Sequence, residues 1–385
     1  MKRKIKVSKD AIFFGATTIV MLLMIFFGMN SDLWRNSTSD DEEVLFLSGR
    51  VVEVVHDRTS LNEAGARVGS QDLRIELLSG TRRGDVIEAQ NLLFPIEHSV
   101  YAQENQRVLV FFHQGADGAT DNYFSHVQSH DRAFGIYFIV LVFLALLVII
   151  FGKSGLRAAF GLIFTFVTII FLLLPLISAG YSPGLLTIGV SVLIVVISII
   201  AIMGFQQKTY VSILGSCVGI MFYVLFYFLT TLVLRIDGFN VAEIDLLIVA
   251  GFYIGAREML FASILIASLG GIMDVTVSLA SAIFELSITT TQKQVTFKAL
   301  FRSGMQVSKD IVGSSSNTLI LAFTGTFLIS LILFATMNTN YHLLINRVDI
   351  AIEILRAISA SAAMIVCAPV TVLIGAHVFS KRRPA

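Results

Sequence analysis

Four charged side chains stand out because they lie inside a stretch that is otherwise apolar enough to enter a bilayer. The stretch runs from Glu243 to Leu286, and its charged members are Arg257, Glu258, Asp274 and Glu285. Hydrocarbon penalises each such group by about 2.5 kcal/mol or more unless it is paired or hydrated. Residues of this kind commonly line transport or ion pathways, so we expect a site for a polar solute or an ion here.

The second half of this stretch aligns its polar groups. Asp274, Ser278, Ser281 and Glu285 are separated by steps of four, three and four residues. On a helix these steps keep them within a sector of roughly 40°. Two carboxylates and two hydroxyls on one face could coordinate a cation, relay protons or bind a polar solute. Two simpler interpretations stay open: Glu285 faces water at the inner end, or the charges form ion pairs that only hold helices together.

Length predicts that the stretch is interrupted. As one helix, residues 243–286 would extend about 66 Å, roughly twice the hydrocarbon thickness. We expect the break at Gly270-Gly271. Arg257 and Glu258 are adjacent and point about 100° apart, so we expect Arg257 to meet Asp274 or Glu285 across the break. Farther along, Asn317 stands among hydroxyl residues, either as part of a substrate site or as the cap of the next helix.

Composition sets the class of protein. Hydrophobic residues make up 55% of the 385 and charged residues 14%, with 31 phenylalanines. Soluble domains carry about 25% charged residues, so this chain is a mainly α, polytopic membrane protein. The expected spans are 11–29, 133–151, 156–178, 185–204, 211–234, the stretch 243–286, 315–336 and 355–379.

The first 132 residues are organised differently. Residues 1–29 read as a basic cytoplasmic tail followed by an uncleaved transmembrane anchor. Residues 30–132 contain five short β-type runs, which predict a small extracytoplasmic barrel of OB-like or SH3-like type. We expect it to dock a partner or gate the membrane part. It lacks a basic stripe interleaved with aromatics, so nucleic acid is not an expected partner. The domain contains four histidines, which are either surface residues or part of a metal site: His98, His113, His126 and His130.

Basic loops predict the orientation of residues 133–385. The loop 289–313 carries Lys293, Lys298, Arg302 and Lys309, and the chain ends with Lys381-Arg382-Arg383. The positive-inside rule places both in the cytoplasm, together with the amino terminus. An odd number of crossings must then separate residue 243 from residue 289. We therefore expect one crossing plus a broken or re-entrant half-helix, giving about eight spans. The basic loop is either an amphipathic surface helix or a solvated linker.

Several classes of protein are disfavoured by missing motifs. The chain has no Walker loop, GxSxG, HExxH or redox cysteine pair, so we expect neither an enzyme nor a cofactor. An intramembrane enzyme using Asp274 and Glu285 as an acid pair is a minor alternative. Cys217 and Cys367 lie in apolar segments and read as small buried hydrophobes. The identity of any metal stays unknown from the sequence.

At this point the residues carry a family resemblance. The run REMLFASILIASLGGIMDVTVSLASAIFEL, the basic loop after it and the run SSSNTLILAFTGTFL resemble the YibE/F family of bacterial membrane proteins. The resemblance covers roughly residues 130–380, and the β-domain looks like that of the longer, YibE-type members. It implies the membrane architecture and assembly as a homo- or hetero-oligomer with a related YibE/F-type protein. It implies no particular activity.

Two functions remain as hypotheses. The first is a transporter or exporter of a small solute or ion in the bacterial cytoplasmic membrane, with the charged residues of 243–286 as its site. The second is a non-transporting envelope scaffold or receptor that docks a partner through its β-domain. In both, the lipid bilayer surrounds residues 133–385 and the β-domain lies outside the cytoplasm.

Overall fold

The computed structural model describes most of the chain in two units. Described are residues 9–31, 33, 44–63, 65–80, 82–94, 100–114, 123–236, 238, 244, 246–247, 255–289, 296–337 and 340–381. One unit comprises residues 33–146, and the other comprises residues 1–32 together with 147–385. Five residues named above lie outside the described residues: His98, Glu243, Lys293, Arg382 and Arg383.

Five strands of the first unit form a closed barrel. They are β1 (Val44–Leu61), β2 (Arg67–Leu77), β3 (Val86–Leu93), β4 (Arg107–Gln114) and β5 (Tyr123–His130). The strand order is β1-β2-β3-β5-β4, with β4 pairing back to β1. All ladders are antiparallel except β3 with β5, which is parallel and joined at Gln90 and His126. A small five-stranded β-domain at this place in the chain was predicted, and the structure has it.

The barrel interior is filled mainly by alternating apolar side chains. In β3 buried and exposed positions alternate strictly, and from Gln71 to Leu77 of β2 buried positions alternate with half-buried or exposed ones, as a two-residue period requires. Two buried amides interrupt this core: the Asn91 side chain donates to Gln71 Oε1 at 2.9 Å and to the Val100 carbonyl at 2.6 Å. Gln71 in turn bonds both backbone groups of Ala102. These bonds hold residues 100–102 against the barrel, because buried polar groups must be paired.

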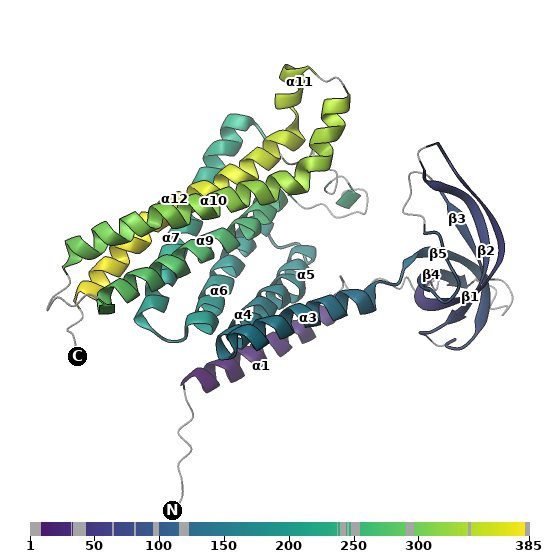
Figure 1. Ribbon diagram of the computed structural model, residues 1–385, viewed down its shortest axis with the longest axis horizontal. Helices are drawn as coiled ribbons and strands as arrows, with labels where there is room; N and C mark the ends of the chain where they lie inside the picture. Colours follow the sequence, from purple (N-terminus) through teal and green to yellow (C-terminus); the bar gives the residue numbers. More distant parts are fainter. Residues whose placement is uncertain are drawn as a thin grey trace, which may run out of the picture. The chain divides into compact units, whose positions relative to one another are not determined.

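Helices make up the rest of the described chain, shown in Figure 1. Their bounds are α1 (Lys9–Met29), α3 (Ala133–Phe151), α4 (Lys153–Thr168), the π-helical turn η1 (Ile169–Leu173), α5 (Leu174–Ser178), α6 (Pro183–Met203), α7 (Gln207–Leu234), α9 (Ala256–Thr289), α10 (Phe297–Thr336), α11 (Tyr341–Ile345) and α12 (Val348–Ser380). Eight helical segments among the described residues are long and apolar enough to cross a membrane. Each one matches an expected span, so the predicted number of about eight is confirmed for helices of this kind.

The predicted break at Gly270-Gly271 is wrong. Helix α9 is continuous from Ala256 to Thr289 and passes through both glycines. The length argument failed because the helix begins at Ala256 rather than at Glu243. Its 34 residues extend about 51 Å, which one tilted crossing with a projecting end can accommodate. Gly271 serves packing instead: an added methyl group would come 2.8 Å from Leu319 of α10 and from Met364 of α12.

Helix α10 also differs from the expectation. The basic segment is neither a separate surface helix nor a linker over its described part, because α10 runs without interruption from Phe297 to Thr336. Its cap is Thr296, whose hydroxyl accepts from the Ala299 amide at 3.3 Å. Asn317 lies in the middle of the helix and therefore caps nothing. Helix propensity persists through the basic residues because Lys and Arg are good helix formers.

The centre of the helical unit is formed by α7, α9 and α12. Helix α9 has most of its apolar segment buried, and α12 has half. Glycines allow the close approach of α7 to α12: Gly215 lies against Thr371, Gly219 against Cys367, and Gly375 against Val211. Along α7, contacts at residues 211, 215 and 219 meet residues 375, 371 and 367 of α12 in that order. The two helices are therefore antiparallel. The polar groups on these three helices are consequently brought together inside the bundle.

Candidate functional site

The buried face of α7 carries hydroxyl groups along most of its length. They recur at spacings of three, four or seven residues and belong to Thr209, Ser212, Ser216, Tyr223, Tyr227 and Thr231. None is more than 7% exposed. Spacings of three and four keep side chains on one face of a helix, and this face is turned toward α9 and α12. We call these six residues the α7 lane.

Hydroxyls from neighbouring helices join the middle of the α7 lane. Ser216 Oγ and Thr276 Oγ1 of α9 are 2.7 Å apart, and Ser212 Oγ donates to Thr276 Oγ1 at 3.3 Å. Thr371 of α12 lies beside Gly215 and donates to the Cys367 carbonyl at 2.7 Å. All these side chains are fully buried. The result is a hydroxyl-rich patch inside a bundle whose surroundings are apolar.

An ion pair lies near the end of the bundle where α12 begins. Arg356 Nη1 is 3.0 Å from Glu353 Oε2, and the two side chains are 29% and 14% exposed. On the same side of the bundle, the Tyr227 hydroxyl of α7 donates to the backbone carbonyl of Arg257 in α9 at 3.3 Å. This half of the bundle therefore contains an ion pair on α12 and the two buried phenols of α7. A small polar solute or an ion could be recognised by this combination of groups.

Several polar atoms in this region have no hydrogen-bond partner among the described residues. They include the Tyr223 hydroxyl, the second oxygen of Glu353, and the Ser359 hydroxyl one turn beyond Arg356. Tyr223 and Ser359 are both 0% exposed. An unpaired buried polar group costs about 1–3 kcal/mol, so a structural role does not explain these hydroxyls. They are the groups that a bound ligand or water would satisfy.

Apolar contact separates the two halves of the α7 lane. Gly219 stands between Ser216 and Tyr223, and the space beside it is filled by Ile272 of α9 and Cys367 of α12. A methyl group added at Gly219 would come 2.9 Å from Ile272 and 3.1 Å from Cys367. The hydroxyl patch and the ion-pair region are therefore separated by a layer of packed apolar side chains, which we call the constriction.

The residues singled out from the sequence lie elsewhere and do not form one cluster. Asp274 is exposed on α9, and its Oδ2 accepts from Ser315 Oγ of α10 at 3.1 Å. Ser278 and Ser281 are half-buried and Glu285 is exposed, so the predicted stripe exists as one flank of α9. Asn317 follows Ser315 by two residues, a rotation of roughly 200° that turns it away from α9.

The contacts of Glu258 and Arg257 also differ from those expected from the sequence. Glu258 Oε2 accepts from Ser182 Oγ at 2.6 Å and from the Gly184 amide at 3.3 Å, at the first turn of α6. A carboxylate is stabilised at a helix N-terminus by the helix dipole, so Glu258 joins α9 to α6. The expected pairing of Arg257 with Asp274 or Glu285 is wrong, because all three residues belong to one continuous helix. Rises of 17 and 28 residues place them about 25 and 42 Å from Arg257 along its axis.

Sequence reasoning missed the lane and the ion pair. The expected span 355–379 began seven residues after the true start of α12 at Val348, and this left Glu353 outside the membrane part. Arg356 was inside the span but was overlooked. The spacing of hydroxyl residues in 209–231 was available as a signal, since steps of three and four predict a single polar face. No signal indicated that this face is buried.

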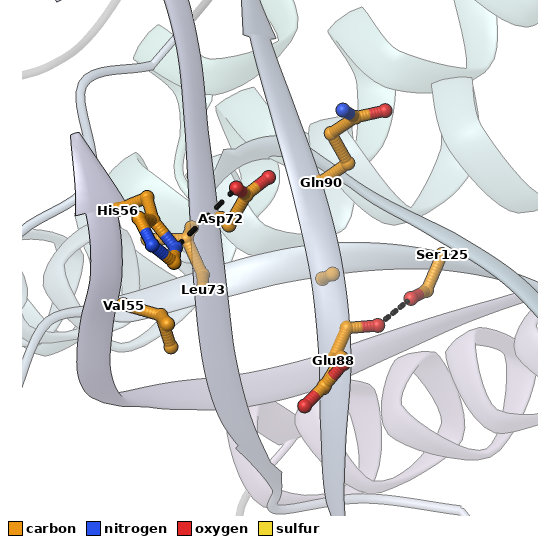
Figure 2. A pocket seen from close by; sticks show the side chains of 8 residues that line it. Val55, His56, Asp72, Leu73, Glu88, Gln90 and Ser125 are labelled. Carbon is orange, nitrogen blue, oxygen red and sulfur yellow. Dashed lines mark hydrogen bonds and ion pairs between the residues drawn. The ribbon is translucent and has the colours of Figure 1, made fainter. Parts of the chain in front are cut away.

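The barrel holds a second candidate, a surface groove of about 460 Å³ over β1, β2, β3 and β5. Figure 2 shows its polar residues, with His56 Nδ1 3.7 Å from Asp72 Oδ2 and Ser125 Oγ donating to the Glu88 carbonyl at 2.7 Å. The His126 ring packs against the Phe111 ring, with the two centroids 4.7 Å apart and the planes tilted by 30°. Across the described residues, no three His, Cys, Asp or Glu side chains are grouped so as to hold a metal ion. The side chain of His113 lies outside what is described.

Burial also affects one titratable group of the barrel. It lowers the pKa of His130 in β5, and the positive charge of Arg132 lowers it further. The neutral imidazole is thus favoured at the end of the last strand.

Comparison with known proteins bears on the helical unit. The family model for YibE/F-like proteins matches residues 139–381, a range that begins within α3 and ends at the close of α12. No curated protein and no solved structure matches the chain. The matched range contains the whole α7–α9–α12 core and leaves out α1 and the barrel. By this match over more than half of its length, the chain belongs to the YibE/F family.

Proposed function

We propose that this protein is a membrane transporter or exporter of a small polar solute or ion, and that its route follows the α7 lane. The observation that carries the proposal is that the hydroxyls of Tyr223 and Ser359 are fully buried and have no hydrogen-bond partner among the described residues. They lie in the half of the bundle that also holds the Glu353–Arg356 ion pair. In a bilayer, buried polar and charged groups without a structural use mark pathways. The constriction at Gly219 supports a closed state between two half-pathways.

This proposal moves the site away from the residues expected from the sequence. Glu258 is occupied at the α6 terminus, and Asp274 lies on an exposed flank. The groups that face each other inside the bundle are instead contributed by α7, α9 and α12. We keep the orientation derived from the basic segments, with both termini in the cytoplasm of a bacterial cell and the barrel outside. The ion pair then lies toward the external side, and Thr209 toward the cytoplasm. The chain acts as a transporter rather than as an enzyme.

The Tyr223→Phe variant tests the proposal because it removes only the unpartnered hydroxyl. Loss of an unsatisfied buried hydroxyl is neutral or stabilising for folding, so the variant should keep its melting temperature and elution profile. Flux in proteoliposomes, measured with a panel of labelled ions and small solutes, should fall strongly. Glu285→Gln is the matched control, because Glu285 is exposed near the far end of α9. Full flux in Tyr223→Phe would refute the route.

A partner-docking function of the barrel is a second candidate, favoured by the groove in Figure 2. We infer that the barrel is of OB type, since its order β1-β2-β3-β5-β4 with a parallel β3–β5 contact is that of OB barrels. Such barrels bind ligands over strands 2 and 3, and the groove lies there. As a scaffold, the protein would show no flux but would co-purify with an envelope protein. If the protein is a scaffold, deleting residues 44–132 should abolish this co-purification. If it is only a transporter, the deletion should not change which proteins co-purify.

A further inference from the structure

The outer face of α10 is polar where a membrane helix should be apolar. Only 6% of its apolar segment is buried, against 61% for α9 and 50% for α12. The exposed polar side chains on this face belong to Ser303, Gln306, Asp310, Asn317 and Thr324. Asn317 and Thr324 fall in the part of α10 that the sequence places in the bilayer. Amide and hydroxyl groups in membrane helices hydrogen-bond to other helices rather than face lipid.

These residues follow the repeat of a coiled coil. Ser303, Asp310, Asn317 and Thr324 recur every seven residues, as position a does in a heptad. Position d of the same heptads is occupied by Gln306, Gly313 and Ile320. All seven residues are exposed, and together they are called the α10 seam. A seven-residue repeat keeps one face directed at a second helix with the same repeat over several turns.

Two glycines of α10 lie in different surroundings, one on the side that packs against α12 and one in the seam. Gly304 is buried, and a methyl group there would come 2.8 Å from Val372 of α12. Gly313, in the seam, has nothing within 4 Å of the same position. Contacts within the described chain therefore explain the glycine at 304 but not the one at 313. Small residues at the faces of membrane helices allow close approach of a partner backbone.

The seam suits a second copy of the same chain. Asn, Gln, Ser and Thr side chains both donate and accept hydrogen bonds, so identical residues can pair across a twofold axis. A single Asn at position a is a recognised determinant of register in paired helices. Asp310 is the only acidic member, and the exposed Lys309 beside it at position g can reach the Asp310 of a twofold-related helix. The seam is thus complementary to itself in hydrogen bonding, charge and repeat.

We propose that two copies of this protein associate in the membrane through α10, with the seam residues of one copy against those of the other. The proposal does not depend on transport, since it rests on a face opposite to Ser315 and outside the α7 lane. It accounts for the small buried fraction of α10 and for its polar outer surface. Association of the seam with a different protein is the main competing outcome.

Cysteine cross-linking in native membranes tests this arrangement. Disulfides form only when Cα atoms approach to about 4.4–6.8 Å, so the reaction reports the facing positions. Asn317→Cys and Thr324→Cys would be made separately in full-length protein in which Cys217 and Cys367 are replaced by alanine. Ala322→Cys is the matched control, because it is exposed on the same helix two residues from Thr324 but lies at position f. A mild oxidant would be added, and non-reducing gels would be compared.

Both seam variants should shift from the mass of one chain to the mass of two, and Ala322→Cys should stay monomeric. Thr324→Cys keeps the test valid if the change at Asn317 prevents folding. The proposal is overturned if the seam variants cross-link no more than the control, or if mass spectrometry identifies a different protein in the cross-linked band. Co-purification of two differently tagged copies, lost on Asn317→Leu but kept on Ala322→Leu, is the independent expected result.

Discussion

Two adjacent glycines of α9 allow a sharp test of the helical core. A methyl group at Gly271 would come 2.8 Å from Leu319 Cδ1 and Met364 Sδ, whereas at Gly270 nothing lies within 4 Å. Gly→Ala in a helix interior gains about 0.5–1 kcal/mol by propensity, and both positions gain it equally. Overpacking costs typically about 1–3 kcal/mol. The difference in unfolding free energy between the two variants therefore isolates packing.

We expect Gly270→Ala to be neutral or slightly stabilising. The unfolding free energy of Gly271→Ala should be about 1–3 kcal/mol lower than that of Gly270→Ala. The lower end of that range is favoured because both contacted atoms end flexible side chains. The assay is the melting temperature of purified full-length protein in detergent, followed by loss of the monodisperse peak in size exclusion. If the helix were interrupted at these glycines, both variants would be destabilised. Equal losses would therefore refute the continuous helix described above.

Two further predictions concern the barrel. Burial and the charge of Arg132 hold the pKa of His130 below its usual value, so folding disfavours the protonated imidazole. The contribution of His130 to the stability of the barrel is therefore complete above about pH 6.5, and it is lost as the pH drops through the pKa of the folded state. Melting temperatures across this range should show the fall, and His130→Gln should flatten it. Gly69→Ala should destabilise the barrel by about 1–3 kcal/mol or more, because Gly69 has φ +128° and a Cβ there would clash with the Arg58 carbonyl. Gly84→Ala, with φ +96° but open space, is the control and should cost strain alone in the same thermal assay.

Local patterns in the sequence predicted the elements of this fold well. Alternation and turn residues indicated the five strands, and long apolar runs indicated the membrane helices. Helix ends were less predictable, and two errors followed from them. Starting the central helix at Glu243 rather than Ala256 produced a break that does not exist. Starting the last span at 355 rather than Val348 left out Glu353.

The candidate site could be predicted only in part, for a physical reason. A charge in an apolar run is visible in one segment, but its partner belongs to another helix. Glu258 reads as a free intramembrane carboxylate until α6 supplies Ser182 and Gly184. In the sequence Tyr223 is an ordinary aromatic residue, but packing buries its hydroxyl with no hydrogen-bond partner among the described residues. Three-dimensional packing, and not residue type, decides which polar groups are left over for a ligand.

A transport route through this core requires that water reaches the α7 lane from both sides of the membrane, on either side of its constriction. It is tested by reacting Ser359→Cys and Ser216→Cys, in protein lacking Cys217 and Cys367, with a membrane-impermeant thiol reagent applied to either side of oriented vesicles. The control is Ser198→Cys, since Ser198 is equally buried but packs against Gly161 of α4. We expect Ser359→Cys to react from one side, Ser216→Cys from the other, and Ser198→Cys from neither. Protection of all three would contradict a route through this core.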